Sequence, residues 1–308
     1  MNKNQSIAVV TGSSTGIGLS TSILLARNGF YTYATMRDTK KRHAIEKIAN
    51  QENLPLEILS LNVDDDRSVK KSIQKIFDKS NHIDILVNNA GYGLFGALED
   101  VSMEAIKKQF ETNLFGPIRM IKEVLPIMRK QMDGIIINVS SISGMLGIPG
   151  SSAYVSTKFA LEGLSESISY EIEPYGIKLI LIEPGVINTN FVSNLNLPNP
   201  VDRRAQKTIL KGRTSSDNYS NKNRNNITLS NYSNTIDAFL SHYYPAMQKA
   251  PLPEDVSAVI LESINNATHS SESFFRFTVG KDAKAFLEAK KRMSDSQLHE
   301  FVSSKLLK

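Results

Sequence analysis

The sequence predicts an α/β protein, a single domain in which helices cover both faces of a doubly wound parallel sheet of about seven strands. Short β-branched or apolar runs alternate with amphipathic stretches of helical length through the first 190 residues. This alternation is typical of parallel strands joined by crossover helices. The strand runs are almost continuously hydrophobic, as expected for strands buried on both faces. Right-handed crossovers should follow.

The elements are expected in the following order. Six strands are expected in the first part of the chain, at 6–11, 31–36, 56–61, 83–87, 135–139 and 178–182. The helices between them are expected near 17–28, 40–51, 66–80, 102–131 and 154–173. After Pro253 a helix near 254–267 precedes an apolar run at 274–279, which predicts the last strand. The charged amphipathic sequence beyond it predicts two further helices.

The segment 190–250 interrupts this pattern. Asparagine, serine and charged residues fill its centre, at about 214–234, and such a composition cannot build a core. We therefore expect a mobile stretch there. Long loops over an α/β sheet usually serve function, so the wider segment is predicted to be a substrate lid inserted within one domain, 1–308.

Composition limits the possible functions. Hydrophobic residues make up 41% and charged residues 22%, as in ordinary globular proteins. The apolar runs are too short to span a bilayer, and the N-terminus lacks the pattern of a signal peptide. The absence of cysteine excludes disulfides and thiolate metal sites. The net charge of +5 is scattered among acidic neighbours, which favours an anionic cofactor over nucleic acid. We expect a cytoplasmic location, without a transmembrane segment or metal.

A glycine-rich turn follows the first strand and opens the first helix, in VVTGSSTGIGL at 9–19. Glycines there permit a tight turn, close approach of backbone to a pyrophosphate, and close packing of helix on strand. The helix N-terminus offers free N–H groups and a partial positive charge to the phosphates. The residues expected to hold the phosphates are Gly12, Ser13, Ser14, Thr15, Gly16, Ile17 and Gly18.

The spacing T-G-x-x-x-G-x-G resembles that of the short-chain dehydrogenase/reductase family. Five further marks of that family stand in order along the chain, each at its expected place relative to the strands. They are Asn88-Asn89-Ala90-Gly91, Asn113, Ser141 thirteen residues before Tyr154, the pair Tyr154 and Lys158 in Y-V-S-T-K, and Pro184-Gly185 with Thr189. The resemblance covers roughly 6–190 and implies a Rossmann-type fold and a dehydrogenase or reductase of alcohols and carbonyl compounds.

The resemblance implies a role for each residue of the catalytic set. Tyr154 would be the general acid/base, and Lys158, four residues on, would favour its phenolate by charge and hold the nicotinamide ribose. Ser141 would orient the substrate oxygen. Asn113 would relay protons through water, or could instead only cap or kink its helix.

Two other serines could take the role of Ser141, and further residues are expected to contact the cofactor. Ser140 and Ser143 compete with Ser141, and only the spacing to Tyr154 favours the last. The resemblance implies further cofactor contacts in the turns after the third, fourth and sixth strands. These residues are Asn62, Val63, Asn89, Ala90, Gly91, Pro184, Gly185, Val186 and Thr189.

The end of the second strand, Y-A-T-M-R-D, favours NADP(H) over NAD(H). Met36 occupies the position where an NAD enzyme commonly places an acid for the ribose hydroxyls. Arg37 follows and can bind a 2′-phosphate by charge-assisted hydrogen bonds. Asp38 could take the acidic role instead if the strand ends later. Asn62 stands where the family usually has an aspartate that binds the adenine amino group.

The nearest likeness within the family is to the hydroxysteroid and retinol dehydrogenase branch. It rests on A-T-M-R-D, G-Y-G-L-F-G at 91–96, S-T-K-F-A-L-E-G-L-S-E-S at 156–167 and I-E-P-G at 182–185. This branch implies a bulky apolar carbonyl or alcohol substrate, steroid-, retinoid- or lipid-like. The residues expected to bind it are Leu94, Met145, Leu146 and Ile148, with Ser141 and Tyr154.

Two other functions and an assembly are also considered. A 3-ketoacyl-carrier-protein reductase would need a basic docking patch, which the arginines and lysines at 203–213 could supply. A redox sensor would bind NADP without turnover, but it needs no acid/base pair. The apolar stripe of the helix at 154–173 is long enough for core and interface, so a homodimer or homotetramer is expected.

Overall fold

The computed structural model describes residues 5–189 and 230–308. Seven parallel strands form one sheet in the order β3-β2-β1-β4-β5-β6-β7. This confirms the predicted fold class. The strands are β1 Ile7–Val10, β2 Tyr31–Met36, β3 Leu56–Ser60, β4 Ile85–Asn88, β5 Gly134–Val139, β6 Ile177–Pro184 and β7 Phe274–Val279.

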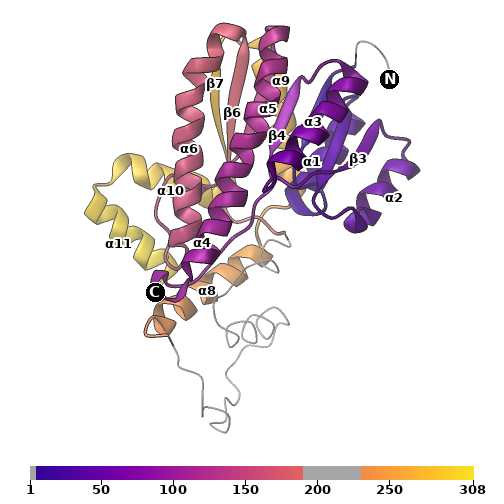
Figure 1. The fold of residues 1–308 in the computed structure, drawn as a ribbon. Coiled ribbons are helices and arrows are strands. Elements are labelled where there is room, and N and C mark those ends of the chain that lie inside the picture. The colour runs from indigo at the N-terminus through magenta and orange to yellow at the C-terminus, as the bar shows by residue number, and fades with distance from the viewer. Residues whose placement is uncertain (1–4, 190–229) are drawn as a thin grey trace.

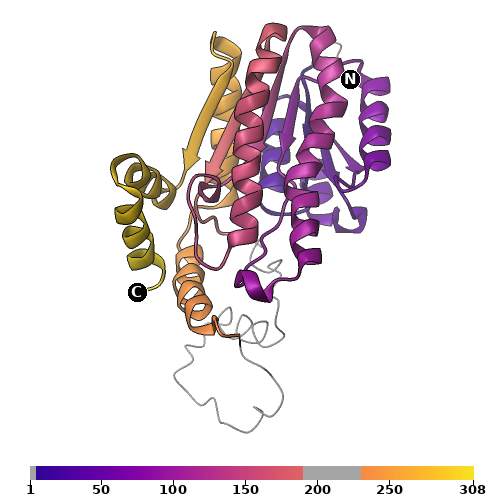
Figure 2. The same ribbon diagram turned by 60° about the vertical axis from the view of Figure 1, so that its left-hand side comes forward.

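Helices cover both faces of the sheet (Figures 1 and 2). Side chains of α3, α5 and α6 pack on one face, and those of α1 and α9 pack on the other. The helices are α1 Gly16–Arg27, α2 His43–Gln51, α3 Asp66–Ser80, α4 Met103–Phe110, α5 Gly116–Gln131, α6 Ser152–Ile172, α8 Ser233–Gln248, α9 Pro253–His269, α10 Lys281–Arg292 and α11 Asp295–Leu306. Short 3₁₀ helices are η1 Thr39–Lys41, η2 Leu98–Asp100, η4 Ile142–Gly144 and η5 Glu173–Tyr175.

The helix predicted at 102–131 is divided in the structure. A π-helical turn, η3 Glu111–Phe115, separates α4 from α5. Pro117 is the second residue of α5 and has no N–H for the carbonyl of Asn113, which an α-helix would require. The wider turn is favoured there, and π turns often mark functional sites. Asn113 lies within it.

The part of the predicted lid that the structure describes is helical. Helix α8 lies below the carboxyl ends of the strands, beside the end of α11 (Figures 1 and 2). Residues 190–229, with most of the predicted mobile stretch and the whole predicted docking patch, lie outside the described residues. The two predicted C-terminal helices are present as α10 and α11. Within the described ranges, none of the helices is both long and apolar enough to cross a membrane.

Candidate active site

A cavity of about 830 Å³ opens where the strand order reverses. Strand β1 lies between β2 and β4. The chain adds β2 and β3 on one side of β1, and then crosses back to add β4 on the other side. The loops after β1 and β4 therefore diverge and leave a crevice at the carboxyl ends of the strands, the usual ligand site of such sheets.

Most of the cofactor residues expected from the sequence line this cavity. They are Gly12, Ser14, Thr15, Gly16, Ile17, Arg37, Asn62, Val63, Asn89, Ala90, Gly91, Tyr154, Lys158, Pro184, Gly185, Val186 and Thr189. Ser13 and Gly18 are not among the lining residues. Ser13 is fully buried and its hydroxyl donates to Val10 O at 3.0 Å, so its side chain is turned away from the expected phosphates.

The glycines of this loop leave space for a ligand, and side chains at these positions would fill that space. Gly12 has φ +71°, a conformation that glycine adopts without strain, and a Cβ there would lie 2.9 Å from Ala90 Cα. Helix α1 begins at Gly16 with no side-chain cap and no acidic residue in its first turn. Its first N–H groups and the positive end of its dipole face the cavity, which is a suitable environment for a pyrophosphate.

The adenosine end of the cavity carries two basic side chains. Arg37 and Lys41 both line it. The Asp38 carboxylate accepts a hydrogen bond from Lys40 N at 3.0 Å and so caps η1. Asn62 Oδ1 accepts from Asp64 N at 3.4 Å within its own turn. Lys41 was missed by sequence reasoning, although a basic residue one short turn after Arg37 was a usable signal.

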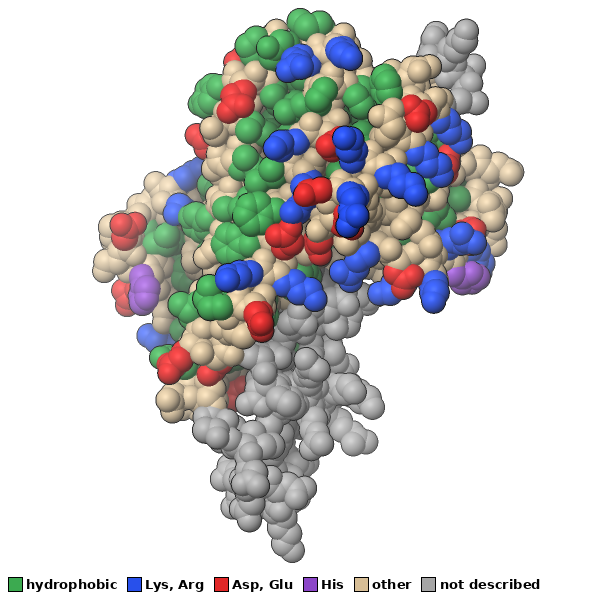
Figure 3. All heavy atoms as spheres, viewed as in Figure 1, with side chains coloured by type: hydrophobic (Ala, Val, Ile, Leu, Met, Phe, Trp, Pro, Cys, Tyr) green, Lys and Arg blue, Asp and Glu red, His purple; other side chains and the backbone are tan. Residues whose placement is uncertain are grey.

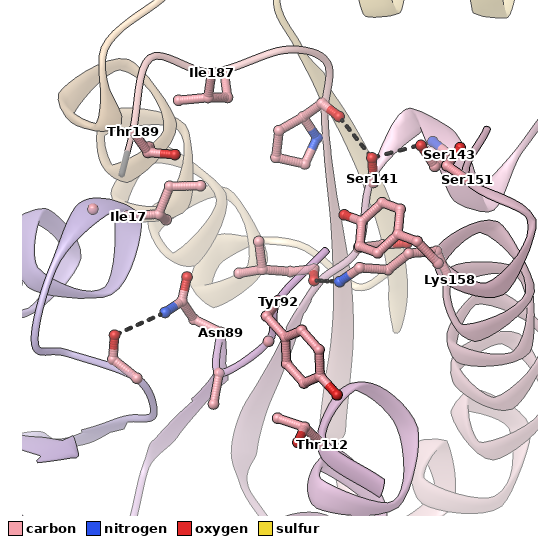
Figure 4. Close-up of a pocket in the computed structure, with 18 of the residues that line it drawn as sticks. Ile17, Asn89, Tyr92, Thr112, Ser141, Ser143, Ser151, Lys158, Ile187 and Thr189 are labelled. Carbon is pink, nitrogen blue, oxygen red and sulfur yellow. Dashed lines mark hydrogen bonds between the residues drawn. The ribbon is translucent and has the colours of Figure 1, made fainter. Parts of the chain in front are cut away.

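Tyr154, Lys158 and Ser141 meet beside the cavity. Lys158 Nζ lies 5.8 Å from the Tyr154 ring centroid and donates to Val139 O at 2.8 Å. Ser141 Oγ donates to Pro184 O at 3.3 Å and accepts from Ser143 N at 3.1 Å (Figure 4). The three candidate serines all line the cavity, and Ser141 hydrogen-bonds Tyr154.

Burial governs the ionisation of this pair. It raises the pKa of Tyr154 to about 12, and the hydrogen bond from Ser141 opposes the rise. Burial lowers the pKa of Lys158 to about 8, and the charge of Glu162 opposes that fall. A tyrosine with this pKa can act as an acid, and it needs a neighbouring positive charge to act as a base.

Asn113 is buried and does not line the cavity. Its Nδ2 donates to Tyr92 O at 3.0 Å and to Thr157 Oγ1 at 3.2 Å. Its Oδ1 accepts from Tyr92 N at 3.1 Å. The side chain therefore ties the loop after β4, which carries Tyr92 into the cavity (Figure 4), to helix α6. This geometry gives the residue a structural task.

Aromatic side chains form the wall next to Tyr154. The ring centroid of Phe95 lies 6.3 Å from that of Tyr154, 5.5 Å from Phe239 and 5.3 Å from Tyr243. Phe239 and Tyr243 come from α8, one helical turn apart, which was a signal in the sequence of the predicted lid. Leu306 of α11 and Phe286 of α10 complete the lining; no local pattern identifies these two distant residues.

Only part of the predicted substrate set lines the cavity. Ile148 does, with Ser141 and Tyr154. Leu94 instead packs with Val101 and Ala153. Leu146, and beside it Met145, pack beneath α10 and α11 with a cluster that contains Ala283 and Val302. The C-terminal helices cover η4, and that contact buries Leu146 and partly buries Met145.

The site shares its sequence pattern with known proteins. The family model described as short chain dehydrogenase matches residues 6–199. A 3-ketodihydrosphingosine reductase of Bacteroides thetaiotaomicron is 40% identical over 191 residues, 62% of this chain and 67% of that protein. Retinol dehydrogenase 8 of Bos taurus is 38% identical over 61% of this chain and 61% of its own. Human 17-beta-hydroxysteroid dehydrogenase type 1 is 35% identical over 62% and 60%.

Solved structures extend the likeness over nearly the whole chain. A short-chain dehydrogenase from Streptomyces avermitilis superposes with a TM-score of 0.74 at 26% identity, covering 98% of each chain. ElxO with NADP bound has a TM-score of 0.66 at 27% identity and covers 89% of this chain and 97% of its own. The aligned part spans 67%, 61% and 60% of the three relatives named above.

Proposed function

The chain belongs to the short-chain dehydrogenase family, near its hydroxysteroid and retinol dehydrogenase members, and we propose that it is an NADP(H)-dependent reductase or dehydrogenase of a bulky apolar ketone or alcohol. The observation that carries the proposal is the meeting of Tyr154, Lys158 and Ser141 beside an apolar, aromatic wall. When bound, the nicotinamide supplies the hydride in reduction and accepts it in oxidation.

Each residue of the set has a task in this reaction. Tyr154 donates its hydroxyl proton to the carbonyl oxygen during reduction and takes it back during oxidation. Ser141, already hydrogen-bonded to Tyr154, orients the same oxygen and stabilises the charge that develops on it. Lys158 favours the phenolate by its charge. Asn113 acts by holding the Tyr92 loop against α6.

The preference for NADP(H) rests on the basic pair at the adenosine end. Arg37 and Lys41 line the cavity there, and a guanidinium can bind a phosphate with two parallel hydrogen bonds. Asp38, the residue that could have accepted the ribose hydroxyls instead, is engaged with its own η1 turn. A 2′-phosphate bound here would thus lie near two cations. The acid that follows Arg37 in the chain, Asp38, already accepts a hydrogen bond from the backbone.

The substrate class rests on the wall and on the relatives. Phe95, Phe239, Tyr243, Ile148 and Leu306 make the space beside Tyr154 apolar. Burial of such surface favours a ligand by about 25 cal/mol per Å². Relatives named for 3-ketodihydrosphingosine, retinol and 17-beta-hydroxysteroids agree with a lipid-like carbonyl or alcohol.

The test is oxidation of NADPH, with NADH in parallel, against steroid, retinoid, long-chain aliphatic and acyl-thioester ketones. We expect turnover with one of the first three classes and its loss in Tyr154→Phe, with NADPH binding retained. Tyr170→Phe is the matched control, because Tyr170 lies on the same helix and is 70% exposed. Near wild-type turnover in Tyr154→Phe would refute the acid/base assignment. Tight NADPH binding without turnover on any ketone would favour a sensor.

We also propose that the chain forms a homodimer or homotetramer through α5 and α6. Hydrophobic side chains gather over these helices on the face in Figure 3. Phe115, directly before α5, is 45% exposed, and Phe159 and Tyr170 of α6 are 43% and 70% exposed. Analytical ultracentrifugation should give a dimer or tetramer that Phe159→Glu weakens; a wild-type monomer at micromolar concentration would refute this.

A further inference from the structure

A buried cluster of charged side chains lies behind Lys158. Glu162 follows Lys158 by one turn of α6 and is 5% exposed, and Glu183 of β6 is 1% exposed. Arg276 of β7 forms ion pairs with both carboxylates, with 2.9 Å between Arg276 Nη1 and Glu183 Oε1. Thr278 Oγ1 donates to Glu183 Oε2 at 3.1 Å.

The cluster approaches the candidate active site at Gly144, which directly follows the lining residue Ser143. A Cβ at this position would lie 2.7 Å from Glu162 Cγ, 2.9 Å from Ser140 Oγ and 3.1 Å from Lys158 O. The absence of a side chain therefore lets Glu162 approach Ser140 and the turn of α6 that carries Lys158. Ser140 lines the cavity directly after Val139, whose carbonyl accepts the hydrogen bond from Lys158 Nζ.

The two buried carboxylates of this region share a single arginine, which also pairs with the exposed Glu166. Glu162 and Glu183 carry two negative charges, and Arg276 supplies one positive charge. Glu162 Oε1 and Ser140 Oγ are both buried, and Ser140 is the hydroxyl that interacts with the Glu162 carboxylate. An ionised carboxylate in that state is costly unless a second cation is close. The Lys158 ammonium, on the same face of α6, is the cation available.

Burial disfavours the charged form of both groups, and neighbouring charges act against it. Burial lowers the pKa of Lys158, and the charge of Glu162 opposes that fall. Burial raises the pKa of Glu162; the interaction with Ser140 and the charge of Arg276 oppose that rise, whereas the charge of Glu183 adds to it. The titratable and charged groups around the two are Tyr154 and Glu166 on α6, Glu183 on β6, Arg276 on β7, Tyr243 on α8 and Asp282 on α10.

We propose that Glu162 is a positioning residue whose buried carboxylate, anchored by Arg276, is the counter-ion that keeps Lys158 charged beside Tyr154. The inference rests on the proposed function, because it assigns a role to the charge of Lys158. Glu162 acts through Lys158 and touches neither substrate nor cofactor. Loss of its charge makes Lys158 release its proton at lower pH, and the tyrosine then loses the positive charge that supports proton transfer.

The experiment compares Glu162→Gln with Glu166→Gln. Glu166 pairs with the same arginine, at 3.2 Å, but its side chain is 57% exposed, so its removal is the matched control. The readout is the high-pH limb of kcat/KM for carbonyl reduction with NADPH. In Glu162→Gln we expect this limb to move to lower pH by about one unit. A neighbouring charge typically shifts a pKa by about 1–3 units, and the expected movement is the smallest of these shifts. In Glu166→Gln it should stay in place.

The outcomes separate this inference from the proposed function. Loss of activity in Glu162→Gln at all pH values, with the limb unmoved, would indicate a merely structural residue and overturn the inference. If that variant does not fold, Glu183→Gln removes a charge from the same cluster and should move the limb in the same direction; an unmoved limb there overturns the inference too. Wild-type protein without any Tyr154-dependent carbonyl reduction would instead refute the proposed function.

Discussion

The substitution Gly18→Ala tests the close packing of α1 against the loops of the cofactor crevice. A Cβ at Gly18 would lie 2.4 Å from Asn89 Nδ2 and 2.5 Å from Gly12 O, whereas ordinary contacts begin at 3.4 Å. Neither neighbour is free to move. Asn89 Nδ2 donates to Thr11 O at 2.9 Å, and Gly12 O belongs to the backbone of the phosphate loop. The added methyl group must therefore displace α1 or break the hydrogen bond from Asn89 Nδ2 to Thr11 O.

Three contributions determine how much Gly18→Ala changes the free energy of unfolding. Overpacking costs about 1–3 kcal/mol, and loss of the Asn89 hydrogen bond costs about 1 kcal/mol. The higher helix propensity of alanine returns about 1 kcal/mol. Gly18→Ala should therefore lower the free energy of unfolding by about 2 kcal/mol, and Tm by about 3 °C. Because the phosphate loop is displaced, the Kd for NADPH should rise as well.

Gly163→Ala is the matched control for this experiment. Gly163 lies within α6, and no atom lies within 4 Å of a Cβ placed there. Alanine should stabilise the helix by about 1 kcal/mol and leave NADPH binding unchanged. Thermal unfolding followed by circular dichroism, with and without NADPH, measures both variants. If Gly18→Ala is as stable as Gly163→Ala and binds NADPH equally well, the argument from close packing is refuted.

Three further predictions concern the cofactor, the pH dependence of stability and the π turn. Arg37→Ala should lower kcat/KM for NADPH by about 10–100-fold, the value of a charge-assisted hydrogen bond, and leave NADH rates nearly unchanged; equal losses for both cofactors would contradict the 2′-phosphate contact. The pKa of Lys158 is lowered to about 8, so above pH 8 the folded chain binds fewer protons than the unfolded chain. The contribution of Lys158 to the free energy of unfolding therefore rises between pH 8 and the ordinary pKa of a lysine side chain. The lowered pKa corresponds to about 3 kcal/mol, and loss of the Lys158 hydrogen bond to Val139 O costs about 1 kcal/mol. Lys158→Met should thus exceed wild type in the free energy of unfolding by about 2 kcal/mol at pH 7, with a gap in Tm that narrows by pH 9.5; a constant gap would contradict the burial effect. Asn113→Ala removes three hydrogen bonds, two of them to the Tyr92 backbone, and should cost about 2–4 kcal/mol in urea unfolding; a loss below about 1 kcal/mol would show that the loop is held by other contacts.

Local sequence patterns predicted the sheet and the elements that carry the cofactor crevice. The strands are almost continuously apolar, so their positions differ by only a few residues between sequence and structure. Gly12, Arg37 and Asn89 each lie within two residues of the end of a strand, and parallel strands bring such positions to one edge of the sheet. For this reason the sequence alone was sufficient to predict about half of the cavity lining, including most of the expected cofactor residues.

Other features depend on tertiary contacts that no local pattern reports. Ser13 has the same type of side chain as Ser14, yet its hydroxyl turns inward to Val10 O. Leu146 is apolar and near Tyr154 in the sequence, but the C-terminal helices bury it. Phe286 and Leu306 reach the cavity only because α10 and α11 fold back over η4. The role of Arg276 depends on pairing β7 with β6, about a hundred residues away along the chain.

The two halves of the cavity come from different stretches of the chain. Residues 12–189 supply the phosphate loop, the basic pair and Tyr154, whereas α8, α10 and α11, all beyond residue 230, supply Phe239, Tyr243, Phe286 and Leu306. Evolution or a designer can therefore exchange the later helices to change which molecules are accepted, while inheriting the hydride-transfer machinery intact. The family model, which ends at residue 199, stops short of this exchangeable part.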